Sequence, residues 1–181
     1  MRDVLNSRRF RGGFTIVELL IVVVVIAILA AVTIVAYNGI QQRSRDTKRT
    51  ADIATLLKLL DSYKAINASY PSATGDVGNS GYEQSTDTST PFMESLQSSF
   101  STKVPLDPSN TTSHFYRYYR YNLANLATYG CPTNKGGLIV LFAIGYESSS
   151  NMPQSDASLV CSSASWSGSA TTYFKYRFED A

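Results

Sequence analysis

The sequence predicts an α+β protein in which one long N-terminal helix packs against a small antiparallel sheet. An unbroken apolar run over residues 19–36 and an amphipathic pattern over residues 53–63 predict the helix. Three β-prone runs, at 115–121, 138–144 and 172–178, predict the sheet. A sheet must bury its apolar face, and the amphipathic half of the helix is the available partner.

The apolar segment is long enough to cross a membrane. Residues 19–36 read LLIVVVVIAILAAVTIVA, with Thr33 as the only polar member. About 20 apolar residues in a helix span the roughly 30 Å of bilayer hydrocarbon, so the run predicts a transmembrane helix. A cleaved secretory signal has a shorter apolar region, of about 7–15 residues, followed by small residues. Here the small residues Gly12 and Gly13 precede the run, so a conventional secretory signal fits poorly.

The net charge of +2 is concentrated at the N-terminus. Residues 1–13 carry four arginines against Asp3, a local charge of +3, and the rest of the chain is at −1. A charge this small and this segregated gives no reason to expect a nucleic-acid partner or an enzyme for acidic substrates.

Glu18 is the one charged residue within the apolar segment. A carboxylate in a membrane helix costs on the order of 2.5–3.5 kcal/mol at mid-bilayer and less near the interface. One interpretation is that the side chain reaches the aqueous interface. The other is that it has a cationic partner. Cleavage after Gly13 would create an α-amine on Phe14, about one helical turn away, which could pair with Glu18 within one chain or between chains.

Residues 11–20, RGGFTIVELL, resemble the processing signal of type IV pilins and the related type II secretion pseudopilins. The family pattern is a short basic leader, a Gly, an aromatic residue, a Glu and a long apolar helix. The resemblance implies cleavage between Gly13 and Phe14 by a membrane-embedded prepilin peptidase. It also implies N-methylation of Phe14 and an assembly role for the Glu18 carboxylate.

The resemblance extends to the segment after the span, because residues 43–71 are similar to the corresponding part of the major pseudopilins. It implies a pilin-like fold and a precursor in the cytoplasmic membrane with its N-terminus inside and its head outside. An assembly ATPase and a platform protein would then extract the precursor into a helical filament of identical or related subunits. Each side of the span carries four Lys or Arg residues, so the orientation rests on the resemblance and not on charge.

The expected segments follow from these patterns. They are a cleaved cytoplasmic leader (1–13), a transmembrane and filament-core half-helix (14–36), an amphipathic half-helix (37–70), a connecting loop region (71–114) and a sheet with a cysteine-closed loop (115–181). Many type IV pilins have a kinking Pro in the apolar half, but this chain has no Pro before Pro71. We expect any kink or local melting at Asn38 and Gly39, the weakest helix formers.

A cluster of basic residues follows the span, namely Arg43, Arg45, Lys48 and Arg49. It predicts one of three arrangements. The first is a solvated helical face with the local pairs Asp46–Arg49 and Lys48–Asp52. The second is ion pairing between filament subunits, and the third is binding to DNA or an anionic surface. The intervening acid makes the last a weak nucleic-acid signal.

The connecting region has little periodicity. A short helix is expected from Pro91 to about Phe100, and the two prolines of residues 104–108 predict a turn. In pseudopilins a loop near this place can help to bind calcium, and Asp107 and Asn110 are the candidate ligands here. Two ligands fall short of the six to eight oxygens that calcium takes, so we expect a plain turn and no metal.

The strand patterns differ in burial. The run at 138–144 is almost entirely apolar, which predicts a central strand buried on both faces or a strand buried against the helix and neighbouring subunits. The run at 172–178 alternates, with Phe174, Tyr176 and Phe178 on one face and Lys175 and Arg177 on the other. Alternating aromatic and arginine side chains could stack nucleic-acid bases, but core and cross-strand pairing is the preferred interpretation.

Cys131 and Cys161 are the only cysteines. With the head outside the membrane a disulfide is allowed, and an even number in an exported head favours one. Pilins often close a C-terminal loop in this way; the alternative is two reduced cysteines. The enclosed polar stretch 147–158 is the expected exposed variable surface.

We expect no enzymatic activity and no cofactor. His114 is the only histidine, expected at the surface or a strand edge, and no nucleophile motif or phosphate-binding loop accompanies it. The function implied by the resemblance is a structural subunit of a type IV pilus or related filament. The alternatives are a pseudopilin of a type II secretion system and, from another class, an uncleaved signal-anchored adhesin or binding protein.

Overall fold

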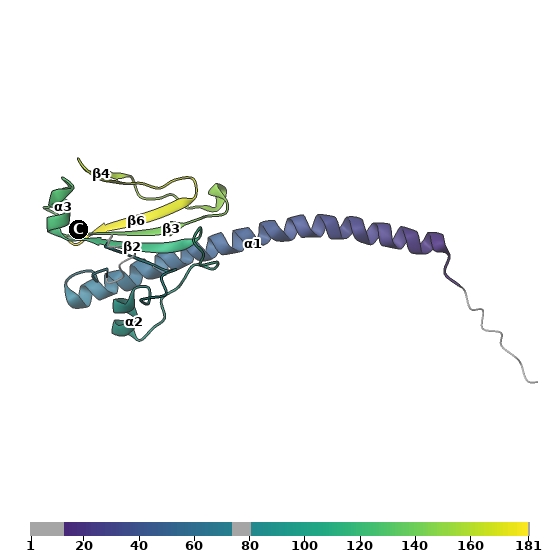
Figure 1. The fold of residues 1–181 in the computed structure, drawn as a ribbon, viewed down its shortest axis with the longest axis horizontal. Coiled ribbons are helices and arrows are strands. Elements are labelled where there is room, and N and C mark those ends of the chain that lie inside the picture. Colours follow the sequence, from purple (N-terminus) through teal and green to yellow (C-terminus); the bar gives the residue numbers. More distant parts are fainter. Residues whose placement is uncertain (1–12, 74–80, 181) are drawn as a thin grey trace, which may run out of the picture. The chain divides into compact units, whose positions relative to one another are not determined.

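The computed structural model describes residues 13–73 and 81–180. The predictions for residues 1–12 of the leader, its arginines included, lie outside the described residues. The chain divides into two compact units, Met1–Ile40 and Gln41–Ala181, each described by itself below. The elements are α1 (Ile16–Asn67), β1 (Tyr82–Gln84), α2 (Glu94–Phe100), β2 (Phe115–Tyr121), α3 (Leu123–Thr128), β3 (Leu138–Ile144), the 3-10 helix η1 (Ser149–Asn151), β4 (Leu159–Val160), β5 (Ser165–Trp166) and β6 (Thr172–Phe178) (Figure 1).

Helix α1 has 52 residues; it begins two residues after the predicted start at 14 and ends three residues before the predicted end at 70. Asn38 and Gly39 were the positions at which any local melting was expected, and the backbone is helical through both. A single Gly costs only about 1 kcal/mol in a helix interior, and the turns on either side of it consist of helix-compatible residues. The helix ends where Ala68 takes a left-handed conformation, with φ of 59°.

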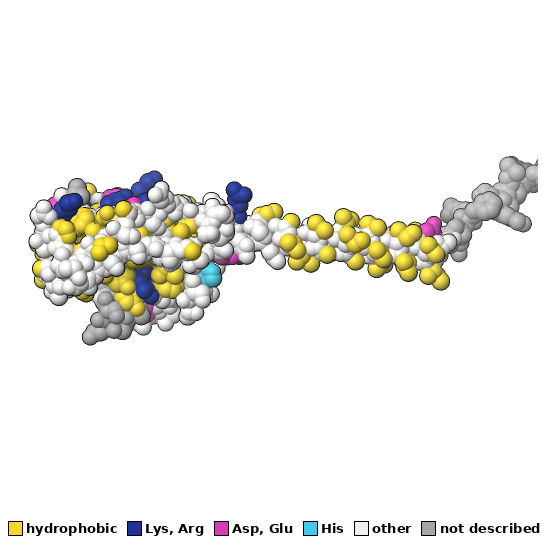
Figure 2. Space-filling view, turned by 90° about the horizontal axis from the view of Figure 1, so that it is seen from above, with side chains coloured by type: hydrophobic (Ala, Val, Ile, Leu, Met, Phe, Trp, Pro, Cys, Tyr) yellow, Lys and Arg dark blue, Asp and Glu magenta, His cyan; other side chains and the backbone are white. Residues whose placement is uncertain are grey.

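The described part of the first unit is mainly the apolar half of α1. Every residue from 13 to 40 is exposed, and hydrophobic side chains cover the visible face of this segment (Figure 2). Among the described residues, α1 is the one helix that length and composition make able to cross a membrane. A helix that is apolar on all sides requires lipid or other protein around it.

The second unit is built on a four-stranded antiparallel sheet of order β1-β2-β3-β6. β2, β3 and β6 have the predicted bounds, and β3 is central and largely buried, as its apolar sequence predicts. Strands β1, β4 and β5 were not predicted, because two or three residues in a polar sequence carry no periodic signal.

One face of the sheet packs on the amphipathic part of α1, as the pattern of apolar residues predicts. Ile53, Leu56 and Leu60 are buried against Tyr116 and Tyr118 of β2 and the inward residues of β3. Alternate residues of each strand point to this face, and the intervening ones point to the opposite face.

The opposite face of the sheet is covered in part by α3 and the β4–β5 hairpin. These two segments are joined by the disulfide Cys131–Cys161, which confirms the predicted pairing. The hairpin places Trp166 over the sheet, where its ring centroid lies 5.0 Å from that of Tyr121. Trp166 is buried together with Phe174 and Phe178 of β6.

The polar stretch 147–158 is less exposed than the sequence suggests. The Asp156 carboxylate accepts hydrogen bonds from the backbone N–H of Tyr176 and the ammonium of Lys175. The Ser155 hydroxyl accepts a hydrogen bond from the backbone N–H of Phe174. These side chains cover the free edge of β6, which protects it from pairing with another strand.

Replacing Cys131 and Cys161 together by serine is expected to lower the free energy of unfolding by about 3–4 kcal/mol, because the disulfide limits the entropy of the unfolded chain. The measurement is denaturant unfolding of the full chain in micelles, followed by the fluorescence of Trp166, the only tryptophan. Reduction of the unmodified protein is the control and should give the same loss. A loss below about 1 kcal/mol in both samples would contradict the prediction.

Candidate functional site

The candidate site begins where α1 begins. The backbone N–H and the hydroxyl of Thr15 each donate a hydrogen bond of 2.8 Å to the same Glu18 carboxylate oxygen. The backbone N–H of Glu18 donates in return to the Thr15 hydroxyl, at 3.2 Å. This reciprocal pattern is a capping box, which satisfies backbone donors that the first turn of a helix leaves unpaired. It explains why the helix begins at Ile16.

This cap was not predicted, since the two interpretations of Glu18 were a side chain that reaches the aqueous interface and a carboxylate paired with a cation. The Thr-x-x-Glu signature of a capping box was present in the sequence as Thr15 and Glu18. Gly13 and Phe14 precede the helix, and the Phe14 side chain is 85% exposed. The Gly13–Phe14 bond therefore lies in accessible, non-helical backbone.

A second group of charged residues joins α1 to two loops within the second unit. Arg49 is fully buried, and its guanidinium donates to Asp107 at 2.7 Å and to Asp46 at 2.8 Å. It also contacts Glu147 at 3.2 Å, and Arg45 makes a bidentate pair with the same carboxylate. We call these five residues the Arg49 cluster.

The contacts within the Arg49 cluster favour the charged forms of Arg49 and Glu147. Burial alone would lower the pKa of Arg49, but the hydrogen bonds and charges of Asp107, Asp46 and Glu147 outweigh that effect and raise it. The hydrogen bond from Arg45 holds the pKa of Glu147 below its ordinary value. The Asp46 carboxylate also accepts the backbone N–H groups of Glu147 and Ser148, which fixes this loop on α1.

The expectation of a solvated basic face is corrected by this cluster. Both predicted local pairs are present, Asp46–Arg49 at 2.8 Å and Lys48–Asp52 at 2.9 Å. However, Arg49 and Asp46 are fully buried, and Arg45 is paired with a residue 102 positions away. Arg45 and Arg49 therefore act within the chain, and Arg43 and Lys48 are the exposed members of the basic cluster.

The candidate calcium ligands Asp107 and Asn110 belong to a loop that is bonded to α1 through Arg49. Both carboxylate oxygens of Asp107 accept hydrogen bonds from Arg49, and one also accepts the backbone N–H groups of Ser109 and Asn110. The Asn110 side chain is hydrogen-bonded to Ser85. Within residues 13–73 and 81–180 no group of three or more acidic, His or Cys side chains could hold a metal ion. Asp107 and Asn110 thus build a turn that is bonded to α1.

His114 lies at the start of β2, an inner strand of the sheet, which agrees with the predicted place at the surface or a strand edge. It is half-buried, directly precedes β2, and its Nδ1 lies 3.4 Å from the Thr111 hydroxyl.

The long helix and the four-stranded antiparallel sheet define a pilin-like α+β protein. Its residues 8–34 match the family described as the prokaryotic N-terminal methylation motif. The chain therefore carries a prepilin-type signal and is homologous, over about a third of its length, to type II secretion pseudopilins and a type IV pilin.

Three relatives illustrate the homology. The type II secretion system core protein G of Pseudomonas aeruginosa is 36% identical over 66 residues, which cover 36% of this chain and 46% of that protein. The same protein of Escherichia coli is 36% identical over 59 residues, 33% of this chain and 41% of the relative. The type IV wide pilus major component PilA4 of Thermus thermophilus is 45% identical over 60 residues, 33% of this chain and 46% of the relative.

The similarity thus spans less than half the length of these relatives. No solved structure gives a significant match.

Arg49→Met is expected to destabilise the second unit by about 3–5 kcal/mol, because it leaves Asp46 and Asp107 buried without a counter-ion. Urea unfolding of the full chain in micelles, read from Trp166 fluorescence, measures the loss. Lys58→Met is the matched control, because it removes an equal charge from an exposed position of the same helix; its effect should stay within about 0.5 kcal/mol. Equal effects of the two substitutions would show that the cluster does not stabilise the fold.

Proposed function

We propose that this chain is a structural subunit of a type IV pilus or related filament, processed at Gly13–Phe14 and assembled through its N-terminal helix. The observation that carries the proposal is the methylation motif over residues 8–34 leading into a helix that is apolar on all sides. The homology to components of a secretion system and a pilus supports a structural role without catalysis or a cofactor.

Cleavage after Gly13 by a prepilin peptidase fits the local geometry. The bond lies outside the helix and is exposed, and peptidases cut accessible, non-helical backbone. A Cβ added at Gly13 would meet no atom within 4 Å, so the packing of this chain does not require a glycine there. The requirement for a small residue would then come from the peptidase. Methylation would follow on the new amine of Phe14.

Assembly would exchange lipid for protein around the apolar helix. As a precursor the chain would sit in the cytoplasmic membrane, with the leader inside and the head outside. In the filament the same surface would pack against the helices of neighbouring subunits. The segments proposed for these roles are the leader 1–13, the membrane and filament-core half 14–36, the amphipathic half 37–70, the connecting region 71–114 and the sheet region 115–181.

Glu18 would set the axial position of each subunit. In an apolar surrounding, an unpaired carboxylate and an unpaired amine are both costly, so the register that pairs Glu18 with the Phe14 amine of a neighbour would be preferred. The partners implied are the prepilin peptidase, identical or related subunits, an assembly ATPase and a platform protein.

A second candidate is a pseudopilin of a type II secretion system, favoured by the matches to core protein G from several bacteria. It would use the same processing and the same helix but form a short filament. Surface filaments seen by electron microscopy of cells that express the chain would distinguish a pilus from a pseudopilus.

Three substitutions separate the two roles open to Glu18. Glu18→Ala removes the charge and the cap, whereas Glu18→Gln removes the charge but can still form a capping box. Thr15→Ala removes the hydroxyl contacts and keeps the charge. We expect all three variants to be inserted and processed, and we expect both Glu18 variants, but not Thr15→Ala, to lose filaments.

Filament yield in sheared fractions, with processing followed by gel mobility, measures the outcome. Normal filament yield from Glu18→Gln would show that the cap, and not the charge, is what assembly requires.

A further inference from the structure

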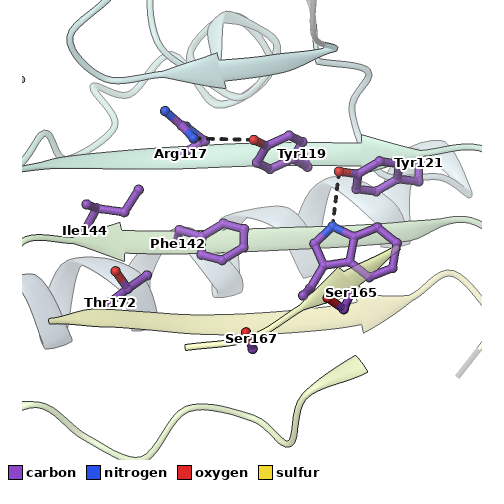
Figure 3. A pocket seen from close by; sticks show the side chains of 9 residues that line it. Arg117, Tyr119, Tyr121, Phe142, Ile144, Ser165, Ser167 and Thr172 are labelled. Atoms are coloured by element: carbon purple, nitrogen blue, oxygen red, sulfur yellow. Dashed lines mark hydrogen bonds between the residues drawn. The ribbon is translucent and has the colours of Figure 1, made fainter. Parts of the chain in front are cut away.

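The outer face of the sheet, the one opposite α1, contains a hollow of about 340 Å³. It lies between β2, β3, the start of β6 and the β4–β5 hairpin, and Figure 3 shows side chains from these strands converging on it. Its lining comprises Arg117, Tyr119, Tyr121, Phe142, Ile144, Ser165, Trp166, Ser167 and Thr172. We call this hollow the aromatic groove. It plays no part in the function proposed above.

Aromatic rings form one side of the groove. Tyr119 and Tyr121 lie next but one on β2 with nearly parallel rings, 5.6 Å apart and inclined by 6°. Phe142 of β3 meets the Tyr119 ring edge-on at 5.9 Å. The Tyr121 hydroxyl accepts a hydrogen bond from the Trp166 indole N–H at 3.1 Å, which fixes both rings. Tyr119, Tyr121 and Phe142 remain half-exposed, so apolar ring surface is available to a ligand.

Polar groups form the opposite rim. The hydroxyls of Ser165, Ser167 and Thr172 make no hydrogen bond to other residues that the structure describes. Arg117 closes one end, held over the rings of Tyr82 at 4.4 Å and Phe115 at 5.0 Å. No carboxylate is among the residues that line the groove.

The hairpin side of the groove is held rigidly. The disulfide Cys131–Cys161 and the hydrogen bond from Ser163 N–H to the Tyr129 carbonyl attach the hairpin to the end of α3. Tyr129 packs edge-on against Trp166 at 6.2 Å. A site fixed in this way loses little conformational entropy when a ligand binds.

Flat aromatic surface beside free hydroxyls matches the chemistry of a sugar ring. A pyranose with equatorial hydroxyls presents axial C–H groups on its faces, which suit aromatic rings, and hydroxyls around its edge, which suit the rim. The volume lies at the small end of the range for ligand sites. Residues 70–181 carry six basic and nine acidic side chains, and a head with this negative balance repels nucleic acid.

A proline-rich peptide would use the rings but would leave the three rim hydroxyls without a role. We therefore infer that the aromatic groove binds carbohydrate, in the form of an oligosaccharide of gluco-configured pyranose rings. This inference is independent of processing and filament assembly, because the groove lies within the second unit.

The test uses the full chain in a zwitterionic detergent, since detergents with sugar headgroups would compete. The chain is titrated with cellotetraose, and the fluorescence of Trp166, the only tryptophan, reports directly from the groove. We expect a saturable change. Tyr119→Leu and Phe142→Leu keep apolar bulk but remove a flat ring, so each should raise Kd about tenfold or more.

Tyr176→Leu is the matched control, because Tyr176 is a half-buried aromatic residue on the same face of the sheet but outside the groove. It should change Kd by less than about twofold. Thermal unfolding of each variant separates lost binding from lost folding.

No saturable change with cellotetraose would overturn the inference, and so would an equal loss of affinity in Tyr176→Leu. Saturation by a proline-rich peptide or an oligothymidylate in place of the sugar would also overturn it. A fluorescence change that follows the protein concentration and is independent of the sugar would indicate that a second copy of the chain occupies the groove. That result would also overturn the inference.

Discussion

The apolar surface of residues 14–40 must stay out of water, and the other features of this protein depend on that constraint. Each buried Val, Leu or Ile gains about 1.5–3 kcal/mol over the exposed state. Sixteen such residues are exposed in this segment of the helix, so in water it would be tens of kcal/mol from its preferred surroundings. Such a helix requires lipid or other helices around it. The same constraint explains why the helix has no internal proline and keeps its backbone hydrogen bonds through Gly39.

Glu18 is the one charged residue on that apolar surface, and two roles are open to it. Its carboxylate accepts hydrogen bonds from the Thr15 backbone and hydroxyl, so it starts the helix. The same carboxylate lies next to the bond at which the precursor would be cut, where a new amine would appear on Phe14. In the proposed filament the same side chain would also select a neighbouring subunit. Such a double role would account for a carboxylate at a position that is costly in hydrocarbon.

The sheet and loops of the second unit are attached to α1 by two different kinds of interaction. Apolar residues of α1 provide most of the surface buried between the helix and the sheet. The Arg49 cluster fixes the position of the loops on the helix, because a buried guanidinium accepts only a few arrangements of its carboxylates. Such a cluster costs desolvation energy, so its contribution is better understood as fixing the loops that contain Asp107 and Glu147 than as adding net stability. On the other face of the sheet, the disulfide likewise fixes the position of the hairpin that carries Trp166.

The features with a periodic signal could be predicted from the sequence. The bounds of α1, the three long strands, the central place of β3 and the cysteine pair all follow from spacing or parity. The Arg49 cluster could not be predicted, because Arg49 meets Asp107 and Glu147 at separations of 58 and 98 residues, and no local pattern records such pairs. The aromatic groove depends likewise on a hairpin whose strands have only two residues each. The capping box was different, since Thr15 and Glu18 are three residues apart and could have been recognised.

In the proposed function, the mature form of this chain begins at Phe14. Intact mass and N-terminal fragment spectra of the protein isolated from membranes and from sheared filaments measure where that form begins. We expect a mature chain that lacks residues 1–13 and carries one methyl group on the Phe14 amine. A functional form that retains Met1 would rule out this processing and would favour a protein anchored by an uncleaved signal.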